Sequence, residues 1–413
     1  MIFYSPTGAD HFDLPQKSFV KEIPKVCYIN ESLKLVFWCD QHDKAVRNKT
    51  LSQLFSEKEW QLLKNRRNTY LMFFFPDEYY NWYNIREWAE PLKKYNIPTN
   101  KILIVCTDKN FEHWTIKTLR DEFGITNFNI MSTNFLLHKA LDSAKNYLKE
   151  NANVDPLPTK KFSVFSRNYQ LWRLEFYYKL WKNNILPESY FTFQNIMPYH
   201  WDLDGKNLTV PVDSIIEDYS KIIKGKPLSG FLKWLENLPY KAEDDTLYRT
   251  EKYNNFVWDM LKNANIHICI ESHYDPLEKR YIQWPGIEDM TAERLSATFI
   301  TEKVFKPILL KKPFIIVSTP NFFVDFKKLG FKSFSPLINE RYDSKLDNAT
   351  RMRYISKEIY RINRLSAAEM NLLIDKCKPI AEHNYIVATK IAKATVNHRK
   401  CLEWLQKVLG DLS

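Results

Sequence analysis

The stretch FITEKVFKPILLKKPFIIVS, residues 299–318, sets a helix start directly ahead of a short apolar strand. Thr301 is a favourable N-cap residue, so the pattern places Glu302 and Lys303 at the first two helical positions. Backbone N–H groups and the positive end of the helix dipole attract phosphate at such a start. Lysine adds a mobile positive charge, and a carboxylate accepts hydrogen bonds from ribose hydroxyls. The stretch predicts an α/β unit with a site for a nucleoside-diphosphate sugar; the alternative is an ordinary capped helix with a solvated first turn.

The same residues resemble the donor-binding signature of the fucosyltransferase-like glycosyltransferases, a (F/Y)-(V/I)-T-E-K stretch that opens a helix. Here it reads Phe299-Ile300-Thr301-Glu302-Lys303, followed by an apolar helix and the strand Lys312–Val317. The resemblance covers roughly residues 160–345, and no acceptor-domain signature of comparable specificity is found. It implies a GT-B fold, in which two Rossmann-like domains face a central cleft. It also implies a metal-independent reaction whose co-substrate is a nucleotide-diphosphate sugar, with no further cofactor.

Bulk composition limits the class of protein. With 413 residues the chain is too long for one typical core and fits two domains of roughly 150 to 200 residues. Lys and Arg number 60 against 49 Asp and Glu, and this net charge of +11 favours polyanionic partners such as nucleic acid, nucleotide donors or anionic lipid. Only eight glycines occur, and none forms a glycine-rich phosphate loop. The six scattered cysteines indicate neither a zinc site nor a disulfide framework.

Targeting signals are also missing from the sequence. The first residues lack the basic and apolar regions of a signal peptide, and the longest apolar runs, such as Leu71–Phe75, are far shorter than a membrane span. We therefore expect no transmembrane segment and a cytoplasmic location, which is the host cytoplasm if a phage encodes the chain.

Alternating β-rich runs and amphipathic stretches predict parallel sheets covered by helices. We expect a Rossmann-like acceptor domain at residues 1–150, a linker at 151–160, a Rossmann-like donor domain at 161–365, and C-terminal helices at 366–413 that pack back towards the first domain. Residues 187–250 predict an irregular insertion. Strands are expected at Val26–Ile29, Leu35–Cys39, Tyr70–Phe75, Ile102–Thr107, Asn127–Met131, Lys161–Ser166, Asn265–Ser272 and Phe314–Ser318.

Polar residues follow the predicted strands of the second half. Arg167 and Asn168 come after its first strand, and Glu271 and His273 end a later one. Because ligands of open α/β sheets bind beyond the carboxyl ends of the strands, these residues are donor-site candidates. The resemblance implies an arginine on the donor phosphates, which is Arg167 or Arg173, and an acidic residue shortly before the T-E-K helix, which is Glu271. The alternatives are a solvated arginine on a helix surface and a structural histidine.

A catalytic base is expected in the first domain. The acceptor hydroxyl must lose its proton as it attacks, usually to a carboxylate or a histidine. Asp77 and Glu78 follow the strand Tyr70–Phe75, and Asp40 follows Leu35–Cys39. We expect Glu78 or Asp77, and next Asp40, to take this role, the alternative being helix-capping or solvated turn residues.

Two further patterns concern metal and nucleic acid. Asp202 and Asp204 match a D-x-D metal motif, but the following Gly205 favours a turn, and no metal site is predicted. Two basic clusters are candidates for a phosphate backbone, with solvated helix faces as the alternative. They are Lys64, Arg66 and Arg67 in the first domain, and Arg351, Arg353, Arg361 and Arg364 in the second.

Taken together, these patterns predict a glycosyltransferase that moves a sugar from a nucleotide-diphosphate donor to a hydroxyl. The basic charge and the resemblance to phage-type DNA-modifying glycosyltransferases favour a hydroxymethylated pyrimidine in DNA as the acceptor. A glycan acceptor is the alternative that the fucosyltransferase resemblance implies. A non-catalytic nucleic-acid-binding protein is the alternative from another class.

Overall fold

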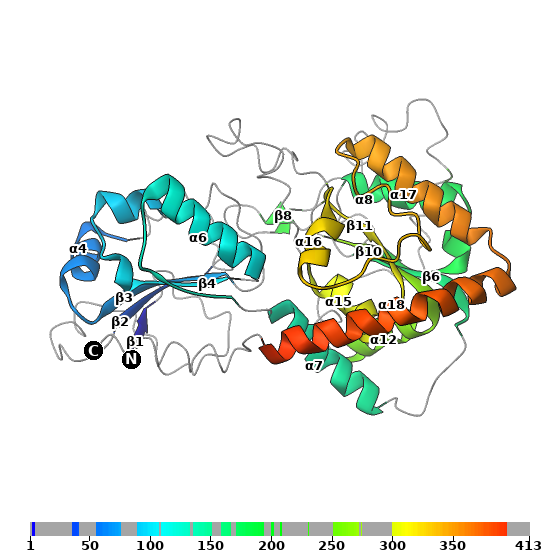
Figure 1. Cartoon of the computed structure of the whole chain (residues 1–413), viewed down its shortest axis with the longest axis horizontal. Helices are drawn as coiled ribbons and strands as arrows, with labels where there is room; N and C mark the ends of the chain where they lie inside the picture. The colour runs from blue at the N-terminus through cyan, green and yellow to red at the C-terminus, as the bar shows by residue number, and fades with distance from the viewer. Residues whose placement is uncertain are drawn as a thin grey trace. The chain divides into compact units, whose positions relative to one another are not determined.

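The computed structural model describes a large part of the chain, in ranges separated by gaps. The described residues are 2–4, 35–40, 55–75, 89–106, 109–132, 135–150, 158–166, 171–193, 200–201, 207–208, 230, 251–271, 274 and 300–394. The chain divides into two compact units (Figure 1). The first comprises Met1–His138, Lys279–Ala297 and Ile391–Ser413, and the second comprises Lys139–Glu278 and Thr298–Lys390.

The first unit contains a five-stranded parallel sheet in the order β1-β2-β3-β4-β5. Its strands are β1 (Ile2–Tyr4), β2 (Leu35–Asp40), β3 (Thr69–Phe75), β4 (Ile102–Cys106) and β5 (Asn129–Ser132). The described helices of this region include α4 (Glu57–Asn65), α6 (Lys109–Phe123) and the start of α7 (Phe135–Glu150), and residues 89–94 are also helical. Four predicted strands are confirmed to within two residues at their ends. The edge strand β1 was not predicted, and the strand expected at 26–29 lies outside the described residues.

The described core of the first unit packs α4 and α6 against the sheet. Trp60 and Leu63 of α4 are buried against Leu71 and Phe73 of β3. Ser56 begins this helix as the N-cap and forms a capping box with its third residue. Burial of these large apolar side chains against the strand is the main stabilising interaction of the helix.

The second unit contains a four-stranded parallel sheet in the order β11-β10-β6-β7. Its strands are β6 (Lys160–Ser166), β7 (Ser189–Phe193), β10 (Ala264–Ile270) and β11 (Phe314–Val317). The chain runs outward from β6 to β7 and then returns to the other side of β6 to form β10 and β11. The strand order therefore reverses between β6 and β10. In open α/β sheets, ligands bind beyond the carboxyl ends of the strands at such a reversal.

Parallel sheets with intervening helices in both units confirm the predicted α/β class. The remaining described helices are α8 (Leu171–Lys182), α12 (Glu251–Lys262), α15 (Glu302–Leu309), α16 (Phe322–Lys328), α17 (Asn348–Asn363) and α18 (Ala367–Ala394). Helices α12 and α15 contact β10, while α17 contacts β11 and α8. Among the described helices, none is long and apolar enough to cross a membrane.

Two sequence expectations for the second unit need correction. The prediction of an irregular insertion at 187–250 is wrong for its first residues, because Ser189–Phe193 forms the edge strand β7 and pairs with β6. Helix α12 was not predicted, although Trp258 and Leu261 on its inner face are fully buried. The short two-residue strands β8 (His200–Trp201) and β9 (Asn207–Leu208) also lie within the expected insertion.

Helix α18 is one continuous helix of 28 residues. Its Asn384 accepts a hydrogen bond from the backbone N–H of Lys332 and donates one to the Lys332 carbonyl, at 2.7 and 2.9 Å. His383 lies 2.9 Å from the carbonyl oxygen of Gly330, whose φ of +92° marks the turn after α16. These contacts join α18 to the second unit.

A buried carboxylate, that of Glu340, and a half-buried one, that of Asp343, hold the segment that follows α16. Glu340 accepts hydrogen bonds from the backbone N–H groups of Phe334 and Ser335, at 2.9 and 3.2 Å. Asp343 accepts from the N–H groups of Phe322 and Phe323, at 2.9 and 3.0 Å, and so caps α16 from a distant position. Burial raises the pKa of Glu340 to about 7 and that of Asp343 to about 6.

These pKa values predict that part of the stability of the second unit is lost as pH rises. Between the ordinary value of 4.5 and about 7, the unfolded chain loses the Glu340 proton while the folded chain keeps it. This difference favours unfolding by up to about 3 kcal/mol above neutral pH. We expect Glu340→Gln to reduce the fall in melting temperature between about pH 5 and pH 8. The exposed Glu382→Gln variant is the control, and equal pH dependence in both variants would refute the assignment.

Candidate functional site

The predicted helix start at Thr301 is confirmed. Thr301 has extended backbone angles (φ −103°, ψ 179°), and its Oγ1 accepts a hydrogen bond from the Lys303 N–H at 3.2 Å. Glu302 and Lys303 are therefore the first two residues of α15. The cap works because a hydroxyl oxygen satisfies an N–H that the helix leaves unpaired.

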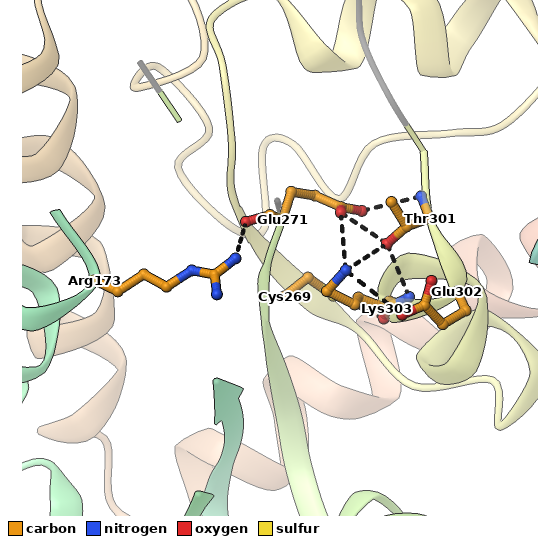
Figure 2. A network of polar contacts seen from close by, with 6 residues as sticks. All are labelled: Arg173, Cys269, Glu271, Thr301, Glu302 and Lys303. Carbon is orange, nitrogen blue, oxygen red and sulfur yellow. Dashed lines mark hydrogen bonds and ion pairs between the residues drawn. The ribbon is translucent and has the colours of Figure 1, made fainter. Parts of the chain in front are cut away.

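Glu271 meets this helix start from the neighbouring strand. It follows β10 directly, and its N–H donates to the Val317 carbonyl of β11 at 3.0 Å. Its buried carboxylate accepts hydrogen bonds from the Thr301 N–H at 3.2 Å and from the Thr301 hydroxyl at 2.7 Å (Figure 2). Burial raises the pKa of Glu271, while Lys303 and Thr301 act in the opposite direction. Two residues predicted separately from the sequence are thus brought into one network.

The Lys303 ammonium lies between this buried carboxylate and solvent. Its Nζ is 3.9 Å from Glu271 Oε2, 3.5 Å from Glu302 Oε1 and 3.3 Å from Thr301 Oγ1. The side chains of Lys303 and Glu302 are 30% and 29% exposed, whereas that of Glu271 is 2% exposed. The Lys303 side chain is therefore partly exposed to solvent, whereas the Glu271 carboxylate that it contacts is not.

Cys269 packs beneath the first turn of α15. Its thiol lies 3.4 Å from the Lys303 carbonyl oxygen and is fully buried. Burial raises the pKa of this thiol well above its usual range, and the nearby Glu271 carboxylate adds to the effect. Cys269 therefore acts as an inert packing residue rather than a nucleophile.

Arg173 of α8 contacts the same strand end from the opposite side of β10 (Figure 2). The side chain is 4% exposed, and its Nη2 donates to the backbone carbonyl of Glu271 at 3.0 Å. The alternative of a solvated arginine on a helix surface is therefore wrong. Arg173 fixes the backbone of Glu271 while Thr301 engages its carboxylate.

An aromatic stack continues from Arg173. Its guanidinium carbon lies 5.1 Å from the centroid of the Trp172 ring, which stacks on Tyr274 at 4.9 Å. At the other end of the stack, the guanidinium carbon of Arg351 lies 4.3 Å from the centroid of the Tyr274 ring. These four side chains join α8, the segment after β10 and α17. Cation–π and stacking contacts of this kind are each worth about 1 kcal/mol.

Arg351 is buried and forms part of this frame. It is 1% exposed, and it donates to the backbone carbonyls of Ser318, Lys345, Leu346 and Tyr274 and to the Asn348 side chain. The prediction that Arg351 belongs to an exposed basic cluster is wrong. A single arginine instead joins the segments that follow β10 and β11, and its burial depends on long-range packing that the local sequence does not encode.

The other predicted residues divide into two groups. Asp40 is the last residue of β2, at its carboxyl end, where it pairs with Phe74 of β3. The candidates Asp77, Glu78, Arg167, Asn168 and His273, and the pair Asp202 and Asp204, lie outside the described residues. Within the part of the chain that the structure describes, no group of three His, Cys, Asp or Glu side chains is placed to hold a metal ion.

The first basic cluster lies at the end of α4. The carbonyls of Leu63, Lys64 and Arg66 accept hydrogen bonds from the buried Lys101 ammonium at 2.8, 3.0 and 2.8 Å. Burial lowers the pKa of Lys101. Arg67 is exposed, while Lys64 and Arg66 are half-buried. Lys101 thus caps the helix end that carries the cluster, a role that the sequence did not indicate.

Comparison with known proteins gives no family assignment. No family model matches the chain. Over 149 residues, or 35% of its length, the chain is 27% identical to the major capsid protein L1 of European elk papillomavirus, and it spans 27% of that protein. The structure of the N-terminal domain of trehalose-6-phosphate phosphatase from Candida albicans aligns with 90% of this chain and 71% of that one, at 14% identity and a TM-score of 0.38. These similarities are too low to support a functional argument.

Proposed function

We propose that the chain is a glycosyltransferase of GT-B architecture that transfers a sugar from a nucleoside-diphosphate donor to a hydroxyl. The proposal rests on the partly exposed Lys303 ammonium on the first turn of α15, which lies 3.9 Å from the carboxylate of the buried Glu271. The strand that precedes Glu271 borders the reversal in strand order, where α/β sheets bind ligands.

In this proposal the residues of the site have distinct roles. The Lys303 ammonium and the N-terminus of α15 hold the donor diphosphate, whose charge grows on the leaving oxygen as the sugar departs. Glu302 accepts hydrogen bonds from the ribose hydroxyls. Glu271 and Arg173 do not touch the donor directly in this scheme but hold Thr301 and the end of β10 in place.

The acceptor that we favour is a hydroxymethylated pyrimidine in DNA, since the net charge of +11 attracts a polyanion and a neutral glycan gains nothing from it. The proton of the attacking hydroxyl would pass to a carboxylate of the first unit. Glu78 and Asp77 follow β3 in the sequence, and Asp40 ends β2. These three residues are the candidates for the base.

Ligand-induced stabilisation tests the donor site. We expect one nucleoside diphosphate, in a series that includes UDP and GDP, to raise the melting temperature, because a ligand that binds the folded state at 100 times its Kd stabilises it by about 2.7 kcal/mol. Lys303→Met should raise the Kd for that nucleotide by about tenfold or more, corresponding to the loss of one charge-assisted contact of about 1.5 to 3 kcal/mol.

Lys306→Met is the matched control, because it removes a half-buried lysine from the same helix one turn later. It should leave nucleotide binding near the wild-type value. If both variants weakened nucleotide binding equally, the effect would come from the loss of positive charge on the helix rather than from a specific site at Lys303. No stabilisation by any nucleoside diphosphate would refute the donor site itself.

A further inference from the structure

Helix α17 has a buried apolar face and an exposed basic one. Its apolar face consists of Met352, Ile355, Ile359 and Ile362, all buried in the second unit. The exposed face consists of Arg353, Lys357, Tyr360, Arg361 and Arg364, which we call the basic stripe. These positions follow the spacing i, i+4, i+7, i+8 and i+11, so they lie along one side of the helix.

The basic stripe contains no acidic side chain. The acidic residue of α17, Glu358, is 4% exposed and lies under the stripe. Its carboxylate accepts hydrogen bonds from Arg361, at 2.6 and 2.9 Å, and from the Asn339 N–H at 2.9 Å. Among the described residues, no carboxylate lies within 4.0 Å of the charged groups of Arg353, Lys357 or Arg364. Within the part of the chain that the structure describes, the charges of these three side chains are therefore not neutralised by a neighbouring acid.

An exposed aromatic ring interrupts the cations. Tyr360 is 41% exposed, and the Arg364 guanidinium lies 5.8 Å from the centroid of its ring. An arginine beside an open aromatic face provides both a phosphate contact and a surface on which a base can stack. A face that only promoted solubility would be expected to carry charges of both signs and no large exposed ring.

We propose that the basic stripe binds the backbone of a nucleic acid. With a rise of about 1.5 Å per residue, its cations are spaced about 4.5 to 6 Å apart along roughly 17 Å of helix. That length matches several consecutive phosphates, which are neutralised by lysine and arginine in sequence-independent binding. An anionic membrane fits less well, because a helix that lies in a membrane interface inserts its apolar face, and that of α17 is buried in the protein.

The proposal goes beyond the donor site and does not depend on it, since none of the stripe residues takes part in the network around Lys303. If the proposed glycosyl transfer is correct, the stripe favours the DNA acceptor over the glycan. If the donor site fails its test, the stripe remains a nucleic-acid surface on a protein of another class.

Fluorescence anisotropy with a labelled oligonucleotide, single-stranded and as a duplex, tests the stripe. The triple variant Arg353→Gln, Lys357→Gln, Arg364→Gln should weaken binding at least about tenfold. The loss of three phosphate contacts should reduce the slope of log K against log salt by about 2.7 for the duplex and about 2.1 for the single strand. Tyr360→Ala should weaken single-strand binding by about tenfold, whereas Tyr360→Phe, which keeps the ring, should not.

The control variant Lys332→Gln, Lys376→Gln, Lys390→Gln removes the same charge from exposed positions outside α17. It should bind nearly as well as the wild type, and its melting temperature and that of the stripe variant should match the wild-type value. The proposal would be overturned if both triple variants weakened oligonucleotide binding equally. It would also be overturned if the wild-type protein bound vesicles containing phosphatidylserine but neither form of the oligonucleotide. Nucleoside-diphosphate stabilisation is measured on the same variants, and we expect the stripe changes to leave it unaltered.

Discussion

Arg351→Met is expected to lower the free energy of unfolding of the second unit by about 4 kcal/mol, a value at the upper end of single substitutions. Methionine keeps much of the apolar volume but removes every donor. The carbonyls of Ser318 and Tyr274 would then lose a hydrogen-bond donor in buried positions, and those of Lys345 and Leu346 would lose one in partly buried positions. Each buried polar group left unsatisfied costs about 1 to 3 kcal/mol. Thermal and urea unfolding measure the loss.

Arg353→Met on the same helix is the stability control, because Arg353 is exposed and donates to no backbone carbonyl among the described hydrogen bonds. It should change the free energy of unfolding by less than about 0.5 kcal/mol. If Arg351→Met lowers the free energy of unfolding as little as Arg353→Met does, then the carbonyl contacts of the buried arginine do not stabilise the sheet edge.

The second large effect is expected at Glu271. Glu271→Ala removes the acceptor of both the Thr301 N–H and the Thr301 hydroxyl, and it leaves the Lys303 ammonium without its buried partner. We expect a loss of about 3 kcal/mol in unfolding free energy. We also expect nucleoside-diphosphate stabilisation to disappear, because the first turn of α15 is no longer held against β10.

Two further variants separate these effects. Glu302→Ala removes a partly exposed carboxylate from the neighbouring position and should cost less than about 1 kcal/mol. Glu271→Gln keeps one oxygen acceptor, so its stability should lie between those of the wild type and Glu271→Ala. If Glu302→Ala lowered the free energy of unfolding as much as Glu271→Ala, then the charge in the first turn, rather than the buried hydrogen bonds of Glu271, would determine stability.

The parts of the site that the sequence revealed are those encoded locally. Thr301, Glu302 and Lys303 are adjacent in the chain, and a cap requires only the right side chain at one position before a helix. Glu271 was found because it ends an apolar strand. Its hydrogen bonds to Thr301 were not predictable, since they span 30 residues.

The parts that were missed depend on long-range packing. Arg351 looks like its exposed neighbour Arg353 in the sequence, and only the position of each on the helix relative to β11 decides which one is buried. The edge strand β7 and helix α12 lie beside a polar, proline-containing stretch that obscured their patterns. Strand β1 is three residues long, which is too short for alternation to be recognised.

The hydrogen bonds of Arg351 also determine how the surrounding sequence can vary. Most of its acceptors are main-chain carbonyls, which every residue type carries, so Ser318, Lys345 and Leu346 can be exchanged for others without loss of an acceptor. The arginine has no such substitute, because lysine has fewer donors and cannot spread them in a plane. Homologous sequences should therefore keep this arginine, while the exposed side chain of Leu346, whose carbonyl it contacts, can vary.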